Sequence, residues 1–228
     1  MHEERFRLKH WHFKDADLVI SLGGDGTFLR ASHYILDKTP VFGVNLDPRN
    51  KEGFFTVSNA LDFEQKLVKI MMGKCKIRQL QRVQAFIDGK KIHEAALNEY
   101  YIASKIPYHT ARYFLTVRKK KERQKSSGIL VAAPAGTYAW AKSAGGKELP
   151  LFSDQFEYVT REPYCGKISA KCSMMQGILE KNEKITIEFE FGQGIIIADS
   201  TAREHQFNAG QKITVTISKN PLYTIRFD

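Results

Sequence analysis

The sequence has few cysteines, no long apolar run and no repeated segment. Cys75, Cys165 and Cys172 are odd in number and form no C-x-x-C pair. This argues against a disulfide framework or a zinc site and fits a reducing compartment. No run approaches the length of a transmembrane helix, and residues 1–10 are too charged for a secretory signal. We therefore expect a soluble, cytoplasmic protein with no membrane partner.

The composition is that of a globular protein with an excess of positive charge. The chain has 228 residues, 43% of them hydrophobic, which is enough for one large or two small domains. Its net charge of +10 favours a polyanionic partner such as a nucleotide or a nucleic acid. Much of the excess lies in residues 118–125, where no aromatic residue is interleaved. We interpret this run as a solvated hairpin, so nucleic acid is the less favoured partner.

Residues 16–29 predict a strand, a glycine turn and a helix in succession. Residues 18–22 are a short apolar run of the kind found in strands that are buried on both faces. Residues 27–36 have apolar side chains at helical spacing. Between them the turn reads G-G-D-G-T, residues 23–27.

This turn suits a phosphate group. Gly23, Gly24, Gly26 and Thr27 would let backbone N–H groups approach phosphate oxygens at the start of a helix. Asp25 would repel a phosphate unless Mg²⁺ lies between them or the carboxylate acts as a base toward a hydroxyl. The pattern therefore indicates phosphoryl transfer. The alternative is a plain strand-to-helix turn in which Asp25 caps the helix.

The rest of the pattern predicts an α/β part followed by a β-rich part. Residues 40–44 form a second buried strand, and residues 61–72 form a helix that Gly73 closes. Asp88-Gly89 marks a type I′ hairpin. Further strands are expected at 113–117, 128–132, 184–191, 194–198, 212–217 and 222–227. The fold class is thus α/β plus β-rich, with a small, shortened N-terminal α/β domain (1–74) and a larger β-rich domain (75–228). The last strand either stays in the second domain or returns to the first.

Three further stretches carry candidate binding residues. Asn45, Asp47 and residues 53–55 follow the second strand, and Phe54 is either a base-stacking ring or core. The Asn98-Glu99 pair suits sugar hydroxyls or a base edge, or it is a polar pair at a strand end. In residues 126–146 a strand enters a turn of small residues and then a helix; Thr137, Tyr138 and Ser143 offer hydroxyls there. The alternative for this stretch is a tight structural turn.

Taken together, these motifs resemble those of the NAD kinase family. They are G-G-D-G-T at 23–27, Asn45 with Gly53-Phe54, Asn98-Glu99, residues 134–146 and Asp199, in matching order from Ala16 onward. G-G-D-G-T alone is shared with lipid kinases of the diacylglycerol and sphingosine type. Those kinases usually continue with a P-x-G-T-x-N-D-like segment, which this chain lacks.

The resemblance implies transfer of the ATP γ-phosphoryl group to the 2′-hydroxyl of the adenosine ribose of NAD, giving NADP. Asp25 would be the base, with Mg²⁺ and the turn amides neutralising the phosphates; no residue is assigned as a metal ligand. The donor is ATP or polyphosphate, and family members assemble as homodimers or homotetramers. The NAD-binding residues implied are Gly26, Phe54, Asn98, Glu99, Tyr138, Ala139, Trp140 and Ser143.

The chain also departs from the family pattern. Many members have G-D-G where this chain has Ser126-Ser127-Gly128, and T-P-T-G-S-T-A-Y reads A-P-A-G-T-Y-A-W at 133–140. Asp199-Ser200 replaces a usual D-G. The D-P after residues 43–46 resembles the mitochondrial-type branch. These departures leave open the choice between NAD and NADH. Two alternatives remain. One is another small-molecule or lipid kinase that shares the glycine turn; the other is a non-catalytic dinucleotide-binding or RNA-binding module, which the shortened N-terminal domain and the basic run would allow.

Overall fold

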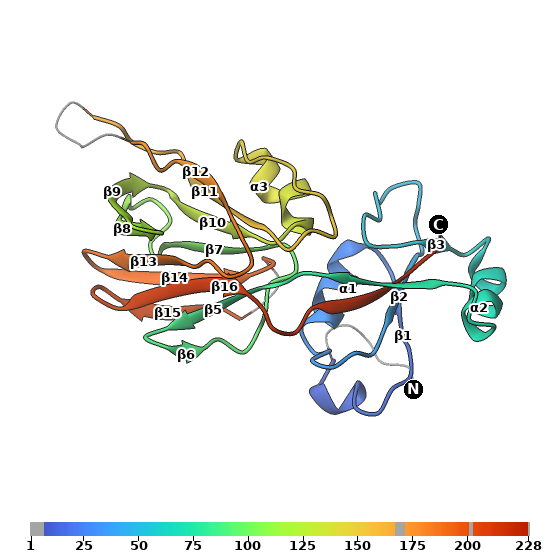
Figure 1. The fold of residues 1–228 in the computed structure, drawn as a ribbon. Coiled ribbons are helices and arrows are strands. Elements are labelled where there is room, and N and C mark those ends of the chain that lie inside the picture. Colours follow the sequence, from blue (N-terminus) through green and yellow to red (C-terminus); the bar gives the residue numbers. More distant parts are fainter. Residues whose placement is uncertain (1–6, 167–171, 201–202, 228) are drawn as a thin grey trace. The chain divides into compact units, whose positions relative to one another are not determined.

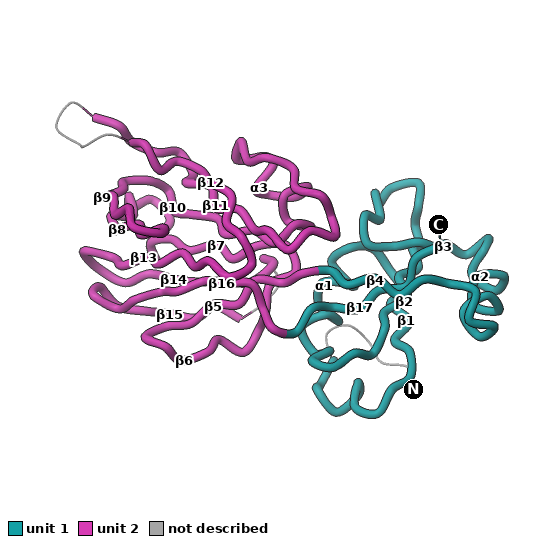
Figure 2. Tube along the Cα trace, in the orientation of Figure 1, with its two compact units in different colours: residues 1–80, 220–228 teal, residues 81–219 magenta. Residues whose placement is uncertain are grey.

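The computed structural model describes residues 7–166, 172–200 and 203–227. The chain divides into two compact units, residues 1–80 with 220–228 and residues 81–219 (Figure 2). The division falls after Leu80 rather than near residue 74, because β4 (Lys76–Leu80) pairs with β17 (Leu222–Arg226). The last strand thus lies in unit 1.

Unit 1 is a small α/β unit built on one sheet (Figure 1). Its strand order is β1-β2-β17-β4, with β3 pairing with β2. β1 and β2 are parallel and are joined through α1, so the predicted strand–helix–strand unit is confirmed. A short 3₁₀ helix, η1 (His10–His12), precedes them. The other elements of unit 1 are β1 (Val19–Leu22), α1 (Asp25–Ser32), β2 (Val41–Asn45), β3 (Ser58–Asn59) and α2 (Phe63–Met71).

The two parallel strands differ in burial, and this corrects one expectation. β2 is buried throughout, as predicted. β1 is not buried on both faces: Ile20 is 38% exposed and Leu22 is 44% exposed. The reason is its position, because β1 is the edge strand of the sheet and Ile20 and Leu22 share one of its faces.

Unit 2 contains two six-stranded sheets with the large hydrophobic core between them (Figure 1). One sheet has the order β12-β11-β10-β7-β14-β15, the other β6-β5-β16-β13-β8-β9. The first comprises β7 (Glu99–Ser104), β10 (Gly128–Ala132), β11 (Phe156–Arg161), β12 (Gln176–Leu179), β14 (Gln193–Ala198) and β15 (His205–Asn208). The second comprises β5 (Val83–Ile87), β6 (Lys90–Lys91), β8 (Ala111–Val117), β9 (Lys120–Ser126), β13 (Ile185–Phe189) and β16 (Lys212–Ile217).

Two hairpins of unit 2 agree with the sequence patterns. Asp88 and Gly89 both have positive φ, 48° and 79°, as a type I′ turn between β5 and β6 requires. The basic run forms the β8–β9 hairpin, and β9 is an edge strand. Arg118 pairs with Glu183 and Arg123 with Glu190. This run therefore lies mainly on a hairpin, as expected.

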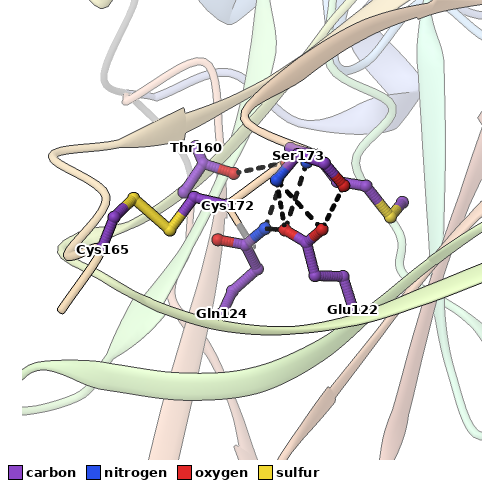
Figure 3. Close-up of a disulfide and its surroundings, with 7 residues drawn as sticks. Glu122, Gln124, Thr160, Cys165, Cys172 and Ser173 are labelled. Carbon is purple, nitrogen blue, oxygen red and sulfur yellow. Dashed lines mark hydrogen bonds between the residues drawn. A yellow bond between two sulfur atoms is a disulfide. The ribbon is translucent and has the colours of Figure 1, made fainter. Parts of the chain in front are cut away.

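A disulfide in unit 2 corrects the reading of the cysteines. Cys165 and Cys172 are joined, with their Cα atoms 5.9 Å apart (Figure 3). β11 and β12 are antiparallel neighbours, so the segments that leave them run close together. The Glu122 carboxylate accepts hydrogen bonds from the backbone N–H groups of Ser173 and Met174 beside the disulfide. The sequence spacing missed this pair because the sheet pairing that joins the two segments is not visible in it.

No helix in the described part of the chain is long and apolar enough to cross a membrane.

Candidate functional site

The glycine turn of unit 1 leaves its backbone open. Gly24 precedes α1 as its N-cap residue, and Gly23 has a φ of +149°, which side chains rarely adopt. A Cβ at Gly23 would lie 2.6 Å from Thr27 Oγ1, whereas one at Gly26 would meet no atom within 4 Å. The backbone around Gly26 is therefore accessible to a ligand at the N-terminus of the helix.

Asp25 is held by a neighbouring loop and does not cap its own helix. Its two carboxylate oxygens accept hydrogen bonds from the backbone N–H groups of Phe54, at 3.0 Å, and Phe55, at 2.9 Å. The N-cap of α1 is Gly24, so the capping alternative does not describe this carboxylate. A carboxylate has about four acceptor sites, so two remain for a substrate hydroxyl or a cation. Its orientation is fixed before any ligand arrives.

Asn45 organises the loop that carries Phe54. Its amide donates to the Lys51 carbonyl at 2.9 Å and accepts from the Asp47 N–H at 3.0 Å. Asn45 is only 3% exposed, so its contacts are within the loop. Phe55 is buried against Phe28, with ring centroids 5.0 Å apart. Phe54 is half-buried and is the ring of this pair that a ligand could reach.

In unit 2, Asp199 organises the Asn98-Glu99 motif. It is 3% exposed and has a φ of 52°. Its carboxylate accepts from the backbone N–H groups of Leu97, Asn98 and Glu99, at 2.9, 2.7 and 3.2 Å. These bonds fix the backbone from which both polar side chains project.

Asn98 and Glu99 each keep one buried oxygen without a hydrogen-bond partner in the structure, Oδ1 and Oε2 respectively. Burial raises the pKa of Glu99 to about 8, the charge of Asp199 raises it further, and the Trp140 backbone N–H opposes the shift. A neutral Glu99 can donate as well as accept a hydrogen bond. Unpaired buried polar atoms in a native protein need an explanation, and a ligand would supply their partners.

The small-residue segment after β10 packs against Asn98. It forms η2 (Ala135–Tyr138) and α3 (Trp140–Ser143). A Cβ at Gly136 would lie 2.1 Å from the Asn98 carbonyl oxygen, which also accepts from the Ala133 N–H at 2.7 Å. Only glycine allows this approach.

The hydroxyls of this segment differ in availability. Thr137 is buried; its Oγ1 donates to the Pro134 carbonyl at 2.7 Å and accepts from the Leu149 N–H at 3.0 Å. It is therefore structural. Tyr138 is 36% exposed although its hydroxyl donates to the Leu149 carbonyl, and Ser143 is exposed.

Three residues that were missed from the sequence lie beside Trp140 or Asp199, namely Tyr101, Arg161 and Arg82. The Arg161 guanidinium lies 4.8 Å from the ring centroid of Trp140 and 5.4 Å from that of Tyr101. Arg82 is 1% exposed; burial lowers its pKa to about 10, and the charge of Asp199 opposes that shift. No spacing in the sequence marks these residues, because sheet pairing brings them to Trp140 and Asp199.

Comparison with known proteins identifies the family. The model of the ATP-NAD kinase N-terminal domain matches residues 4–75, and that of the C-terminal domain matches residues 97–227. A probable NADH kinase of Oryza sativa subsp. japonica is 30% identical over 223 residues, covering 89% of this chain and 68% of that protein. An NAD kinase of Methanopyrus kandleri is 27% identical, covering 94% and 74%.

Two solved structures are similar as well. An NAD kinase from Archaeoglobus fulgidus in complex with ATP has a TM-score of 0.77 at 25% identity, covering 93% of this chain and 78% of that one. Yeast NADH kinase complexed with NADH has a TM-score of 0.80 at 17% identity, covering 92% and 62%, and shows the fold alone. With both domain models matched in order, the chain belongs to the ATP-NAD kinase family and is a kinase.

Proposed function

We propose that this chain transfers the γ-phosphoryl group of ATP to the 2′-hydroxyl of the adenosine ribose of NAD, giving NADP and ADP. The observation that carries the proposal is the Asp25 carboxylate, oriented by two backbone N–H groups beside an open glycine turn. Asp25 takes the proton of the 2′-hydroxyl as its oxygen bonds to the γ-phosphorus and the bond to ADP breaks. Gly23, Gly24, Gly26 and Thr27 contact the phosphates.

A divalent cation such as Mg²⁺ fits this site through phosphate oxygens and one carboxylate. No group of three or more potential metal-ligating side chains occurs in residues 7–166, 172–200 and 203–227. Mg²⁺ commonly uses one or two carboxylates together with substrate phosphates, and Asp25 can supply one. When bound, the ion would neutralise charge on the phosphates.

The NAD-binding part of the proposal rests on unit 2 and Phe54. Asn98 and Glu99 would pair with hydroxyl or amide groups of the dinucleotide, which their unpaired oxygens support. Tyr138, Ala139, Trp140 and Ser143 would line the dinucleotide pocket, and Phe54 would stack near the adenine. Assembly as a homodimer or homotetramer, a cytoplasmic location and a role in NADP biosynthesis belong to the same proposal.

NADH is a second candidate acceptor. The resemblance to a probable NADH kinase at 30% identity favours it, whereas the replacement of G-D-G by Ser126-Ser127-Gly128 leaves the choice between NAD and NADH open. Parallel assays with NAD and NADH separate the two acceptors.

The test is NADP formation by the purified chain with NAD, ATP and Mg²⁺, with polyphosphate and donor-free reactions beside it. We expect donor-dependent NADP from the wild type and at least about a hundredfold less from Asp25→Asn. Asp62→Asn is the matched control, because Asp62 also accepts a backbone N–H, from Asn59 at 2.9 Å, but lies outside the proposed site. Near-normal turnover by Asp25→Asn would exclude Asp25 as the base.

A further inference from the structure

A small cavity in unit 2 lies between α3 and the end of β11. It has a volume of about 230 Å³ and is lined by Trp140, Ser143, Ala144, Arg161 and Glu162. Sites for whole drug-sized ligands are larger, roughly 300–1,000 Å³. The cavity can therefore take one end of a dinucleotide, with the remainder outside.

Glu162 supplies the carboxylate of this cavity in an uncommon backbone conformation. Its φ is 48°, in the left-handed region that is costly for a residue with a long side chain. The Ser127 hydroxyl donates to one carboxylate oxygen, and Arg161 Nη2 lies 3.4 Å from the other. The side chain remains 68% exposed. The carboxylate is thus oriented yet still accessible to a ligand.

The aromatic side of the cavity is rigid. Trp140 and Tyr101 have ring centroids 4.9 Å apart, and the Arg161 guanidinium lies over both rings. The Tyr101 hydroxyl donates to the Ser127 carbonyl at 2.7 Å, and the Ser127 N–H donates to the Arg161 carbonyl at 3.0 Å. The backbone of Ser127 is therefore hydrogen-bonded both to Tyr101 and to Arg161, the residue before Glu162.

We propose that Glu162 is a further binding residue of the dinucleotide pocket proposed above, and that its carboxylate accepts hydrogen bonds from O–H or N–H groups of one nucleoside end. An oriented carboxylate beside an indole ring and the Ser143 hydroxyl offers an acceptor, a stacking or packing surface and a further polar partner. Ser127 occupies the position of the aspartate in the G-D-G of many family members, and Glu162 brings a carboxylate to that position from the adjacent strand end. The proposal rests on the dinucleotide binding proposed above.

Calorimetric titration with NAD tests this assignment. Loss of a hydrogen bond to a charged group should weaken NAD binding by Glu162→Gln about tenfold or more. Glu148→Gln is the matched control, because Glu148 is also exposed and pairs with Lys142 of α3 at 2.6 Å, but does not line the cavity. Ser127→Asp in the Glu162→Gln background should restore part of the affinity by returning a carboxylate to the same place.

Glu162→Gly separates binding from a purely structural role. Glycine adopts positive φ without strain, so this variant should melt at a higher temperature while binding NAD more weakly. Wild-type NAD affinity in both Glu162→Gln and Glu162→Gly would overturn the inference. If the wild type binds NAD through Glu162 but forms no NADP, the phosphoryl transfer proposed above fails and the cavity assignment stands.

Discussion

Asp25 in unit 1 and Asp199 in unit 2 are both held by backbone N–H groups, but they differ in how much of the side chain solvent or a ligand can reach. Each carboxylate accepts backbone N–H groups from a neighbouring segment, two at Asp25 and three at Asp199. Asp25 is half-buried at the start of a helix, whereas Asp199 is 3% exposed. Asp25 therefore keeps acceptor capacity for a ligand, while Asp199 acts on the chain itself. If Asp25 is the base, as proposed, then exposure, more than hydrogen bonding, distinguishes a catalytic carboxylate from a positioning one.

The glycines repeat this contrast. A Cβ at Gly26 would meet nothing within 4 Å, but a Cβ at Gly136 would lie 2.1 Å from the Asn98 carbonyl oxygen. In unit 1 the space beside the glycine is open. In unit 2 the backbone of Asn98 already fills it. The backbone at Gly26 is therefore open, whereas the backbone at Gly136 is held in place by its contact with Asn98.

The largest expected effect separates the two carboxylates. Asp25→Asn should reduce turnover at least about a hundredfold while lowering the free energy of unfolding by no more than about 1 kcal/mol. Asp199→Asn should lower the free energy of unfolding by about 3 kcal/mol, because an amide cannot accept all three N–H groups in a buried site. Initial rates and urea unfolding of both variants measure this. If Asp25→Asn and Asp199→Asn lost the same free energy of unfolding, the two carboxylates would not differ in their structural roles.

The next largest effect is expected for Gly136→Ala. The added methyl group must displace the Asn98 backbone, and we expect a loss of roughly 3 kcal/mol in the free energy of unfolding, at the upper end for overpacking. Urea unfolding is the measurement. Gly145→Ala is a local control for packing, because nothing lies within 4 Å of its added methyl group; its φ of +88° means that it reports backbone strain alone. If Gly136→Ala unfolded with the same free energy as the wild type, the backbone of Asn98 would have to move to make room for the methyl group.

The pH dependence of stability tests the burial of Glu99. Its pKa is about 8 in the folded protein against 4.5 for an ordinary glutamate. Between these values the folded state keeps a proton that the unfolded state loses, so this contribution is fully present below pH 4.5 and is lost as the pH rises toward 8. The slope is at most about 1.4 kcal/mol per pH unit.

Glu99→Gln removes this titration. The free energy of unfolding of the variant minus that of the wild type should therefore increase between pH 5 and pH 8 in urea titrations. A constant difference across this range would show that Glu99 is already ionised in the folded protein at pH 5.

The sequence predicts local features of this molecule better than those made by distant pairing. The G-G-D-G-T turn, the Asp88-Gly89 hairpin and the two-part fold depend on short-range spacing and glycine conformations, and each could be predicted. The exposure of β1 depends on its edge position in a sheet. The Cys165–Cys172 disulfide and the placement of Arg161 over Trp140 depend on which strands become neighbours. Spacing within one segment carries no information on these.

The smallest expected effect on stability is that of a substitution at Gly26, in the open glycine turn of unit 1. Gly26→Ala lies in the first turn of α1, where alanine is a better helix former and the methyl group meets no atom within 4 Å. We expect the free energy of unfolding to rise by about 0.5–1 kcal/mol. The same methyl group should obstruct the approach of a phosphate to the turn, so the KM for ATP should rise. Higher stability with an unchanged KM for ATP would mean that the phosphoryl donor does not use the space beside Gly26. The glycine sites of unit 1 and unit 2 would then differ only in how tightly they are packed.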